Sequence, residues 1–483
     1  STASDDFDLL SARIQIATIE FERLRTNRLM APFIGVLDPF LDHMEAVHQE
    51  LRVASTFAHV LPELAGLDGE RTHLLLFLNN DELRPGGGFI GTYGVLNTKN
   101  GEIISLLTKD VYALDQLSEG YLQTVPPEPL KKYNATTTWY LRDANWDPDF
   151  AQSAIDVIDL FEKESVFVEA ESAVPSSTHI DGVIGFTPNF ASALLSYLGP
   201  IEVGGQVFHA DNVPELIEYE VEQGFQQNGI PYPQRKEILA ELVRQIQDRL
   251  VELPFAKWQS IFYLLAQNIQ HKQLAMYSTN TSVEHALVAA GWAGTLEGST
   301  ADVQMYVDAN LASLKTDPVV NRSVQYDVFR NESGTWIGRT SVTYDHTGQF
   351  DWRTTRYRTY ARLLVPEGTT LIRTVGFLEG PDIAQEVGLT SFGGFVVIEP
   401  GQIQTVVFEY RLSDRVVESI AKQHYQLRVL KQMGARDYPL TLDLDFDKNV
   451  LTALPAENRN AWGDDVYHLN TKLTQDLFFE VGL

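Results

Sequence analysis

The chain contains no cysteine among its 483 residues. Disulfides, thiolate metal sites and cysteine nucleophiles are therefore excluded. A cytosolic chain of this length usually has a few buried thiols, and their absence favours an exported protein that avoids stray disulfides. We therefore expect an extracytoplasmic location at the cell surface.

Long apolar runs and runs of basic residues are also missing. No apolar stretch reaches the roughly 18 residues that cross a bilayer. The chain begins with Ser1 rather than Met, so we expect that a segment has been removed, with an N-terminal membrane anchor as one alternative. The 65 acidic residues outnumber the 37 basic ones and give a formal charge of −28. Such a surface repels phosphate backbones, so we expect no nucleic-acid partner, whereas divalent cations or cationic partners suit it.

Three familiar catalytic motifs are absent from the sequence. It contains no Gly-x-Ser-x-Gly nucleophile elbow, no Walker phosphate-binding loop and no His-Glu-x-x-His zinc motif. Hydrolase, nucleotide-binding and zinc-peptidase functions therefore find no support in the sequence.

The spacing of apolar residues divides the chain into four segments. Residues 1–66 have the helical spacing of a stalk or small bundle, with charges between the apolar positions. Residues 67–318 alternate strand and helix patterns, which predicts an α/β domain. Residues 319–412 consist of short strand patterns separated by turn groups and predict an immunoglobulin-like β-sandwich. Residues 413–483 predict a second β-rich module or a continuation of that sandwich.

The start of the α/β segment has the clearest local signals. His73 to Leu78 is a continuous apolar run, as expected of a strand that is buried on both faces. Gly91 to Leu96 and Ile103 to Leu107 predict a β-hairpin around the turn Lys99-Asn100-Gly101. Helices are predicted over Asp149–Lys163, Asn189–Leu198 and Arg235–Leu250.

Two stretches of this segment resemble the LytR-CpsA-Psr fold. They are Leu74 to Asp115 and Ile180 to Val203. The chain is also similar to a bacterial envelope family catalogued as domain of unknown function 4012. The hallmarks of that family correspond here to Asn79-Asn80, Glu82-Leu83-Arg84-Pro85, Gly87-Gly88-Phe89-Ile90-Gly91, Trp139 to Trp146 and Phe161-Glu162-Lys163-Glu164.

The resemblance implies a site for a lipid-linked phosphate. LytR-CpsA-Psr enzymes transfer a glycopolymer from a polyprenyl pyrophosphate carrier to peptidoglycan, using arginines and a divalent metal. By this resemblance we expect catalytic roles for four residues, namely Arg84, Lys109, Asp110 and Arg235. We expect ligand-binding roles for Asn79, Asn80, Gly87, Gly88 and Arg142, since a glycine loop can present backbone donors to a phosphate.

The chain also departs from these enzymes. Gly86 to Gly88 replace a metal-binding aspartate, and the acidic segment Glu218 to Gln223 lies where the enzymes have arginines. Arg84 has an alternative role as a partner of Glu82 or Asp81 in a tight turn. The protein is therefore either a glycopolymer phosphotransferase or carrier-lipid binder, or a noncatalytic surface protein for assembly or adhesion. Its partners are accordingly a cell-wall or surface glycopolymer, or other copies and surface proteins.

A run of alternating oxygen-bearing residues follows the aromatic hallmark. Asp143, Asn145 and Asp147 can turn oxygens toward one hard cation, Mg²⁺ or Ca²⁺. The alternative is that Asp147 or Asp149 caps the helix that follows, with a proline at its start.

Overall fold

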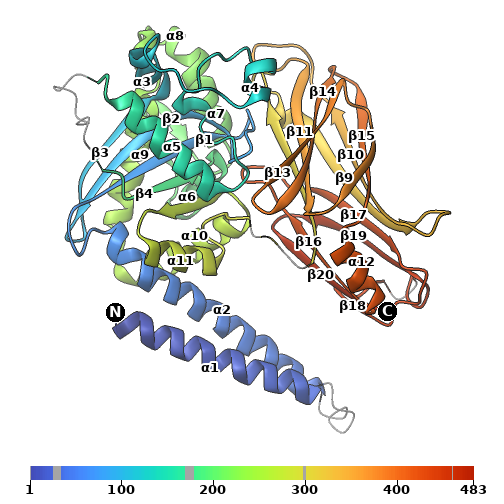
Figure 1. Ribbon diagram of the computed structural model, residues 1–483. Coiled ribbons are helices and arrows are strands. Elements are labelled where there is room, and N and C mark those ends of the chain that lie inside the picture. Colours follow the sequence, from blue (N-terminus) through green and yellow to red (C-terminus); the bar gives the residue numbers. More distant parts are fainter. Residues whose placement is uncertain (1, 26–33, 169–178, 297, 299–300, 459–460) are drawn as a thin grey trace.

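A computed structural model describes residues 2–25, 34–168, 179–296, 298, 301–458 and 461–483. It consists of a helical hairpin, an α/β part and a β-sandwich beside it (Figure 1). The hairpin pairs α1 (Thr2–Arg25) with α2 (Ile34–Leu64), and the C-terminal half of α2 packs on α10 and α11 of the α/β part. Within the described ranges, no helix combines the length and apolar character needed to cross a membrane.

The described α/β part is built on a five-stranded sheet with the order β3-β2-β1-β4-β7. β1 runs parallel to β4, while the β1–β2, β2–β3 and β4–β7 pairs are antiparallel. The turn of the β2–β3 hairpin has left-handed φ values of 53° at Asn100 and 84° at Gly101, as the sequence predicts. The strands are β1 (Arg71–Asn79), β2 (Phe89–Lys99), β3 (Glu102–Asp110), β4 (Gly182–Phe186) and β7 (Leu274–Ser278).

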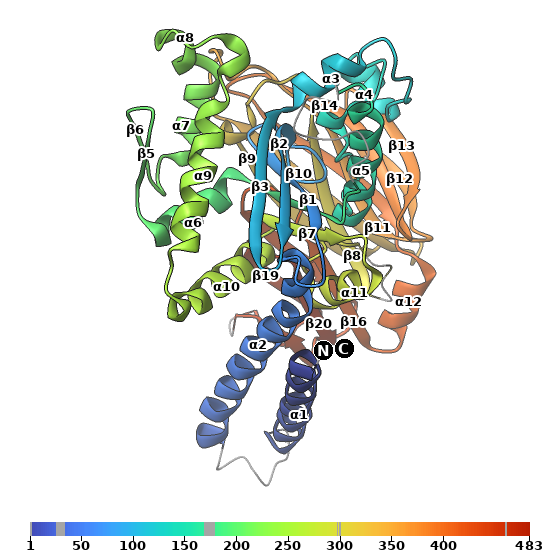
Figure 2. The ribbon, with the colours of Figure 1, turned by 90° about the vertical axis from the view of Figure 1, so that its left-hand side faces the viewer.

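Helices cover both faces of this sheet (Figure 2). Side chains alternate along β1, so Leu74, Leu76 and Leu78 join a core with α3 and α5 on one face. The opposite core contains α6, α9, α10 and α11 together with Phe57 of α2. The helices are α3 (Val111–Ser118), α4 (Glu128–Tyr133), α5 (Phe150–Ser165), α6 (Pro188–Leu198), α7 (Val213–Tyr219), the π-helical turn η3 (Glu220–Gly224), α8 (Phe225–Gln227), α9 (Glu237–Val251), α10 (Phe255–Gln270) and α11 (Thr281–Ala290). A two-stranded ribbon consists of β5 (Ile201–Val203) and β6 (Gln206–Phe208).

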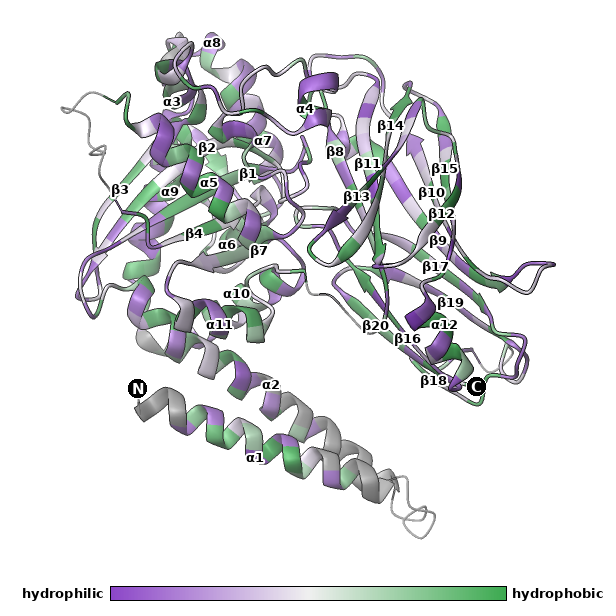
Figure 3. Ribbon diagram, viewed as in Figure 1, coloured by the Kyte–Doolittle hydropathy of each residue, from purple (hydrophilic) through white to green (hydrophobic). Residues whose placement is uncertain are grey.

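The β-sandwich has two sheets in the part of the chain that the structure describes. The six-stranded sheet consists of β12 (Thr370–Val375), β15 (Ile403–Arg411), β10 (Trp336–His346), β9 (Val320–Arg330), β17 (Tyr438–Asp445) and β19 (Val466–Leu473). The seven-stranded sheet consists of β13 (Glu379–Glu386), β14 (Leu389–Ile398), β11 (Tyr357–Pro366), β8 (Asp302–Asn310), β16 (His424–Leu430), β20 (Leu477–Gly482) and β18 (Thr452–Leu454). Residues from both sheets form one core, which α12 (Asp414–Ala421) also joins. The hydropathy pattern alternates along many of these strands (Figure 3).

The strand connections place two segments differently from their sequence-based assignment. β8 lies within residues 67–318, which the sequence assigns to the α/β domain, yet it pairs with β11 and β16 inside the sandwich. The strands of residues 413–483 lie in both sheets of that sandwich and continue it. Two pairings, β16 with β8 and β17 with β9, are parallel. The structure thus has a mixed α/β region followed by a β-rich region, as the sequence predicts.

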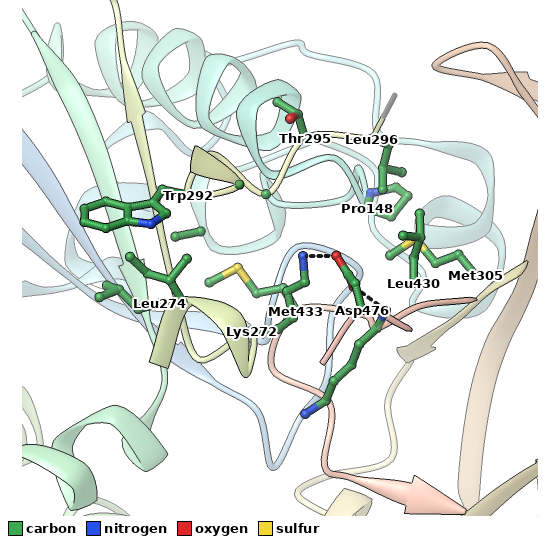
Figure 4. A pocket seen from close by; sticks show the side chains of 15 residues that line it. Pro148, Lys272, Leu274, Trp292, Thr295, Leu296, Met305, Leu430, Met433 and Asp476 are labelled. Atoms are coloured by element: carbon green, nitrogen blue, oxygen red, sulfur yellow. Dashed lines mark hydrogen bonds and ion pairs between the residues drawn. The ribbon is translucent and has the colours of Figure 1, made fainter. Parts of the chain in front are cut away.

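The two parts are packed closely where the turn after α10 meets the sandwich (Figure 4). Lys272 Nζ lies 2.7 Å from Asp476 Oδ2, and the Lys431 amide donates to Asp476 Oδ1 over 2.8 Å. The cavity beside them has a volume of about 20 Å³, which is room for about one water molecule. This contact is therefore a packing seam rather than a ligand site.

Candidate functional site

A large cavity lies between the α/β sheet and its α6–α9 layer. Its volume is about 620 Å³, within the ~300–1,000 Å³ typical of small-molecule sites. The C-terminal end of β1 and the start of β2 form one wall, and α6, α7, η3 and α9 form the others. Lys315, in the connection between the sandwich strands β8 and β9, closes one side.

Most of the cavity wall is apolar, as the strand and helix patterns require. Phe77 points away from the Leu74–Leu76–Leu78 face of β1 because side chains alternate along a strand. Its ring lies 4.7 Å from that of Phe186, which lies 5.9 Å from that of Phe190. The amphipathic helices α6 and α9 complete the wall with Leu194, Leu239, Leu242 and Ile246.

Basic and acidic side chains meet at one side of the cavity, the mouth. Asp110 accepts a hydrogen bond from Lys236 Nζ over 2.9 Å and also caps α3 by accepting from the Tyr112 amide over 3.1 Å. Lys236 Nζ donates in addition to the Gly91 carbonyl. Arg235 Nη2 lies 3.5 Å from Asp110 Oδ2, and Arg235 Nη1 lies 3.7 Å from Glu222 Oε1. Burial lowers the pKa of Lys236.

A second ion cluster continues the mouth toward the sandwich. Lys315 Nζ lies 3.4 Å from Glu218 Oε1 and 3.5 Å from Glu222 Oε1. Asn79 Nδ2 donates to Glu218 Oε2 over 3.2 Å. Burial raises the pKa of Glu218 to about 7, although the positive charge of Lys315 opposes that rise. The mouth therefore has a carboxyl group that titrates near neutral pH.

Three of the residues expected from the resemblance meet at this cavity. Asn79 and Arg235 line it, and Asp110 bonds to Arg235 there. Lys109 is exposed on β3 and is not among the lining residues. Sequence reasoning missed Glu218 and Lys315 as members of one cluster, since no local motif connects these distant positions. Lys236 follows Arg235 directly, and that adjacency was a usable signal.

Arg84 does not reach the cavity. Its side chain is 2% exposed. Nε donates to Asp143 Oδ1 over 3.1 Å, Nη1 to the Asn310 carbonyl over 2.6 Å and Nη2 to Glu82 Oε1 over 3.0 Å. The guanidinium is thus occupied by protein groups on every side, which matches the tight-turn alternative for Arg84 rather than a phosphate contact.

The glycine loop after Arg84 is also occupied by protein contacts. The Gly86 amide donates to the Asn145 carbonyl over 3.0 Å, and the Gly87 amide donates to the Arg84 carbonyl over 3.0 Å. Asn145 Nδ2 donates to the Gly88 carbonyl over 2.7 Å. The Gly86 and Gly87 amides therefore donate to carbonyls of the protein and are not available to bind an anion.

This loop joins the α/β part to the sandwich. Asn80 Nδ2 donates to the Gly434 carbonyl over 2.8 Å. Gln432 Nε2 donates to the Arg84 carbonyl over 3.0 Å. A Cβ on Gly434 would lie 1.9 Å from the Gly87 oxygen, so the two backbones touch where only glycine fits. We call residues 79–88 with residues 432–434 the junction.

The residues expected to bind metal have other partners. Asp143 Oδ1 accepts from Arg84. The Asn145 backbone carbonyl and Nδ2 bond to Gly86 and Gly88, whereas Asn145 Oδ1 has no hydrogen-bond partner among the described residues. Asp147 Oδ1 accepts from the Asp149 amide over 2.8 Å. Asp149 accepts from the Gln152 amide over 3.1 Å and so caps α5. Across the described segments, no three His, Cys, Asp or Glu side chains are placed to hold a metal ion.

Arg142 belongs to a separate buried acid cluster. Its Nη1 donates to Asp115 Oδ2 over 2.7 Å, and its guanidinium stacks on the rings of Tyr112 and Tyr140. Glu164 is 0% exposed and accepts from the Leu141 amide over 2.7 Å. Burial, together with the nearby charge of Asp115, raises the pKa of Glu164, which therefore keeps its proton and donates to Asp115.

We expect this pair to make the stability of the protein fall as pH rises. The folded state keeps the Glu164 proton above the ordinary value of 4.5, whereas the unfolded chain releases it. Stability is thus greatest below that value and is lost as pH rises through the raised pKa. Glu164→Gln keeps a donor for Asp115 and an acceptor for Leu141, so its melting temperature should exceed that of wild type at pH 8 and match it near pH 5. Glu162→Gln, an exposed site on the same helix, is the control. Parallel pH profiles for wild type and Glu164→Gln would contradict the assignment.

Comparison with known proteins gives a family for the segment that contains the site. Residues 68–221 match the model of the family described as "Protein of unknown function (DUF4012)". The matched segment contains the loop at Arg84 and most of the residues that line the cavity. No curated protein matches the chain.

Several solved structures match this chain at low sequence identity. The Lin1025 protein from Listeria innocua is 11% identical, with 48% of this chain and 84% of that chain covered and a TM-score of 0.25. Leukotriene A4 hydrolase from Saccharomyces cerevisiae is 8% identical, with 34% and 29% covered and a TM-score of 0.20. An M1 zinc metallopeptidase from Deinococcus radiodurans is 8% identical, with 36% and 43% covered and a TM-score of 0.17. Likeness at these scores carries no information on function.

Proposed function

We propose that this chain is an extracytoplasmic cell-envelope protein that binds a polyprenyl-type carrier lipid with a phosphate-containing head group. The observation that carries the proposal is the apolar cavity of about 620 Å³ with a charged mouth. The apolar chain of the lipid lies among Phe77, Phe186 and Leu194, and the head lies at Arg235 and Lys315. Burial of apolar surface, at about 25 cal/mol per Å², supplies the binding energy.

The apolar lining of the cavity favours an unbranched or isoprenoid chain over a flat polar metabolite. Its walls come from two layers, the sheet and the α6–α9 helices, so a long ligand can lie between them. The charged groups Lys236, Arg235, Lys315 and Glu218 are joined in one network through Asp110 and Glu222. A ligand with one charged end and one long apolar end matches this division.

Lipid binding receives more support than group transfer. Arg84, which the resemblance assigns to pyrophosphate, is bonded to Glu82, Asp143 and the Asn310 carbonyl instead. The proposal includes no Mg²⁺ or Ca²⁺ at Asp143, Asn145 and Asp147, because the carboxylates of Asp143 and Asp147 already accept bonds within the protein. It retains the likeness of residues 67–318 to the LytR-CpsA-Psr fold and of the sandwich to immunoglobulin-like modules. A surface glycopolymer attached to the carrier is the partner in this view.

A noncatalytic role in surface assembly is the second candidate. The observation in its favour is the junction, where motif residues Asn80, Arg84 and Gly87 hold the sandwich instead of a ligand. In that role the partners are other copies of this chain or other surface proteins. The two candidates differ in whether the cavity takes up a lipid.

Filling the cavity tests the first candidate. We expect farnesyl phosphate to bind the full chain saturably in a native mass-spectrometry titration, and Leu194→Trp to weaken binding at least about tenfold, equivalent to ~1.4 kcal/mol. The added ring occupies the space of the lipid chain, since Leu194 lines the wall. Leu117→Trp, at an exposed leucine on α3, is the matched control and should bind as wild type does. Failure of wild type to bind, or equal binding by both tryptophan variants, would exclude the lipid site and leave the assembly role.

A further inference from the structure

Two buried ionic groups at the mouth have atoms without hydrogen-bond partners. Arg235 and Glu218 are each 6% exposed, and both line the cavity. Considering the described residues alone, Arg235 Nε has no acceptor and Glu218 Oε1 has no donor within hydrogen-bond geometry. Buried polar atoms in native proteins are nearly always satisfied, so unsatisfied ones beside a cavity indicate a place where a ligand completes the bonding.

The charges around Glu218 come from several elements. Lys315 lies nearest among the cations, and Glu222, Asp81 and Arg353 act on it from further away, while Asn79 donates to its other oxygen. Asp81 is itself paired with Arg353 over 2.9 Å and with Arg436 over 3.4 Å. At the mouth, two carboxylates therefore share a single cation: Glu218 and Glu222 both contact Lys315.

An anionic head group at this mouth would compete with these carboxylates. Lys315 is shared between Glu218 and Glu222, and Arg235 is held by Glu222 and Asp110. A phosphate placed between the two cations would lie close to both glutamates, and like charges in a buried site repel each other strongly. Neutralisation of one glutamate removes this repulsion and frees one cation.

Resting on the proposed function, we propose that an anionic head group enters the mouth together with one proton, which neutralises Glu218 and transfers Lys315 from that carboxylate to the head group. The proton comes from solvent and bonds to Glu218 Oε1, the oxygen that has no donor in the described structure. Glu222, whose side chain is 32% exposed, keeps its contact with Arg235. Glu218 thereby determines which head-group charge the cavity accepts at a given pH.

Burial makes Glu218 the group suited to this role. It raises the pKa of Glu218 to about 7, so the carboxylate takes up a proton near neutral pH at little cost. Above that pH the fraction of protonated Glu218 falls tenfold for each pH unit. The affinity for an anionic head group should fall together with this protonated fraction, whereas a neutral head group requires no proton.

The test compares farnesyl phosphate with farnesol on the full chain between about pH 7 and pH 9. A phosphomonoester stays doubly charged over this range, because its second pKa is about 6. For wild type we expect affinity for farnesyl phosphate to fall about tenfold per pH unit, with farnesol binding unchanged. Glu218→Gln should remove the pH dependence and bind farnesyl phosphate about tenfold more tightly than wild type at pH 8. Glu215→Gln, at an exposed glutamate of the same helix, should behave as wild type does.

The outcomes separate this inference from the proposed function. If wild type binds both probes and Glu218→Gln leaves the phosphate-to-alcohol ratio unchanged at every pH, the inference is overturned and the lipid site stands. Equal weakening of both probes in Glu218→Gln would mean a purely structural glutamate and would also overturn it. Absence of binding of either probe to wild type would overturn the lipid site and the inference together.

Discussion

Replacing Arg84 with methionine is expected to lower the free energy of unfolding by about 3–5 kcal/mol. Methionine retains much of the volume of the arginine but removes all three donated bonds. The Asp143 carboxylate, which is 2% exposed, then loses a buried partner, and the Asn310 carbonyl loses its donor. Urea denaturation of wild type and Arg84→Met measures the difference.

The control and the second readout distinguish a structural role from a ligand-binding one. Arg330→Met removes an exposed ion pair with Asp447, in which the side chains are 44% and 54% exposed, and should cost less than about 1 kcal/mol. Under conditions where Arg84→Met is folded, it should still bind farnesyl phosphate, because Arg84 does not line the cavity. A stable Arg84→Met protein that loses lipid binding would contradict the structure and restore the phosphate-binding role that the resemblance implies.

Adding one methyl group at Gly434 is expected to be at least as disruptive. The new Cβ would lie 1.9 Å from the Gly87 oxygen, and φ at Gly434 is 75°. Because the obstacle is backbone of another segment, the junction must separate to accept the alanine. We expect Gly434→Ala to lower the free energy of unfolding by more than about 3 kcal/mol and to increase protease cleavage between the two parts.

Substitution of a second glycine separates the effect of the close contact from the effect of the left-handed backbone conformation. Gly401 has a φ of 79°, and a Cβ there meets nothing within 4 Å. Gly401→Ala therefore carries only the cost of a left-handed residue, about 1 kcal/mol. Similar destabilisation by the two alanine variants would show that the junction yields easily and that its close approach has little energetic importance.

The strands and helices with strong local patterns could be predicted from the sequence. The apolar run at His73–Leu78 became β1, and the glycine turn at Asn100-Gly101 produced the β2–β3 hairpin. β8 was missed because it lies in the middle of a sheet and is buried at every position, so it shows no alternation. It also contains buried Asp302, whose carboxylate accepts from the hydroxyls of Tyr326 and Tyr425 over 2.5 and 2.6 Å. A strand of this kind is recognisable only once its distant partners are known.

The candidate site could be predicted only in part, because several of its contacts join residues that are far apart in the chain. The pair of Asp110 and Arg235 follows from the resemblance, since each lies in a stretch comparable with the enzymes. The contacts of Arg84 depend on Asn310 and those of Lys315 on Glu218, and both pairs join residues far apart in the chain. Sequence spacing contains no information on such pairs. The acidic segment at Glu218 first counted against phosphate binding, and in three dimensions its Glu218 and Glu222 pair with Lys315 and Arg235 at the mouth.

The parallel pairing of β16 with β8 and of β17 with β9 has a consequence for the order in which the protein matures. β8 and β9 lie inside their sheets, flanked on one side by strands that are synthesised more than a hundred residues later. Until residues 424–445 have left the ribosome, both strands present unpaired edges to other chains. The junction loop at Gly434 lies in the same late segment. Completion of the sandwich and its attachment to the α/β part are thus expected as one late event, which makes the nascent chain dependent on protection from aggregation until then.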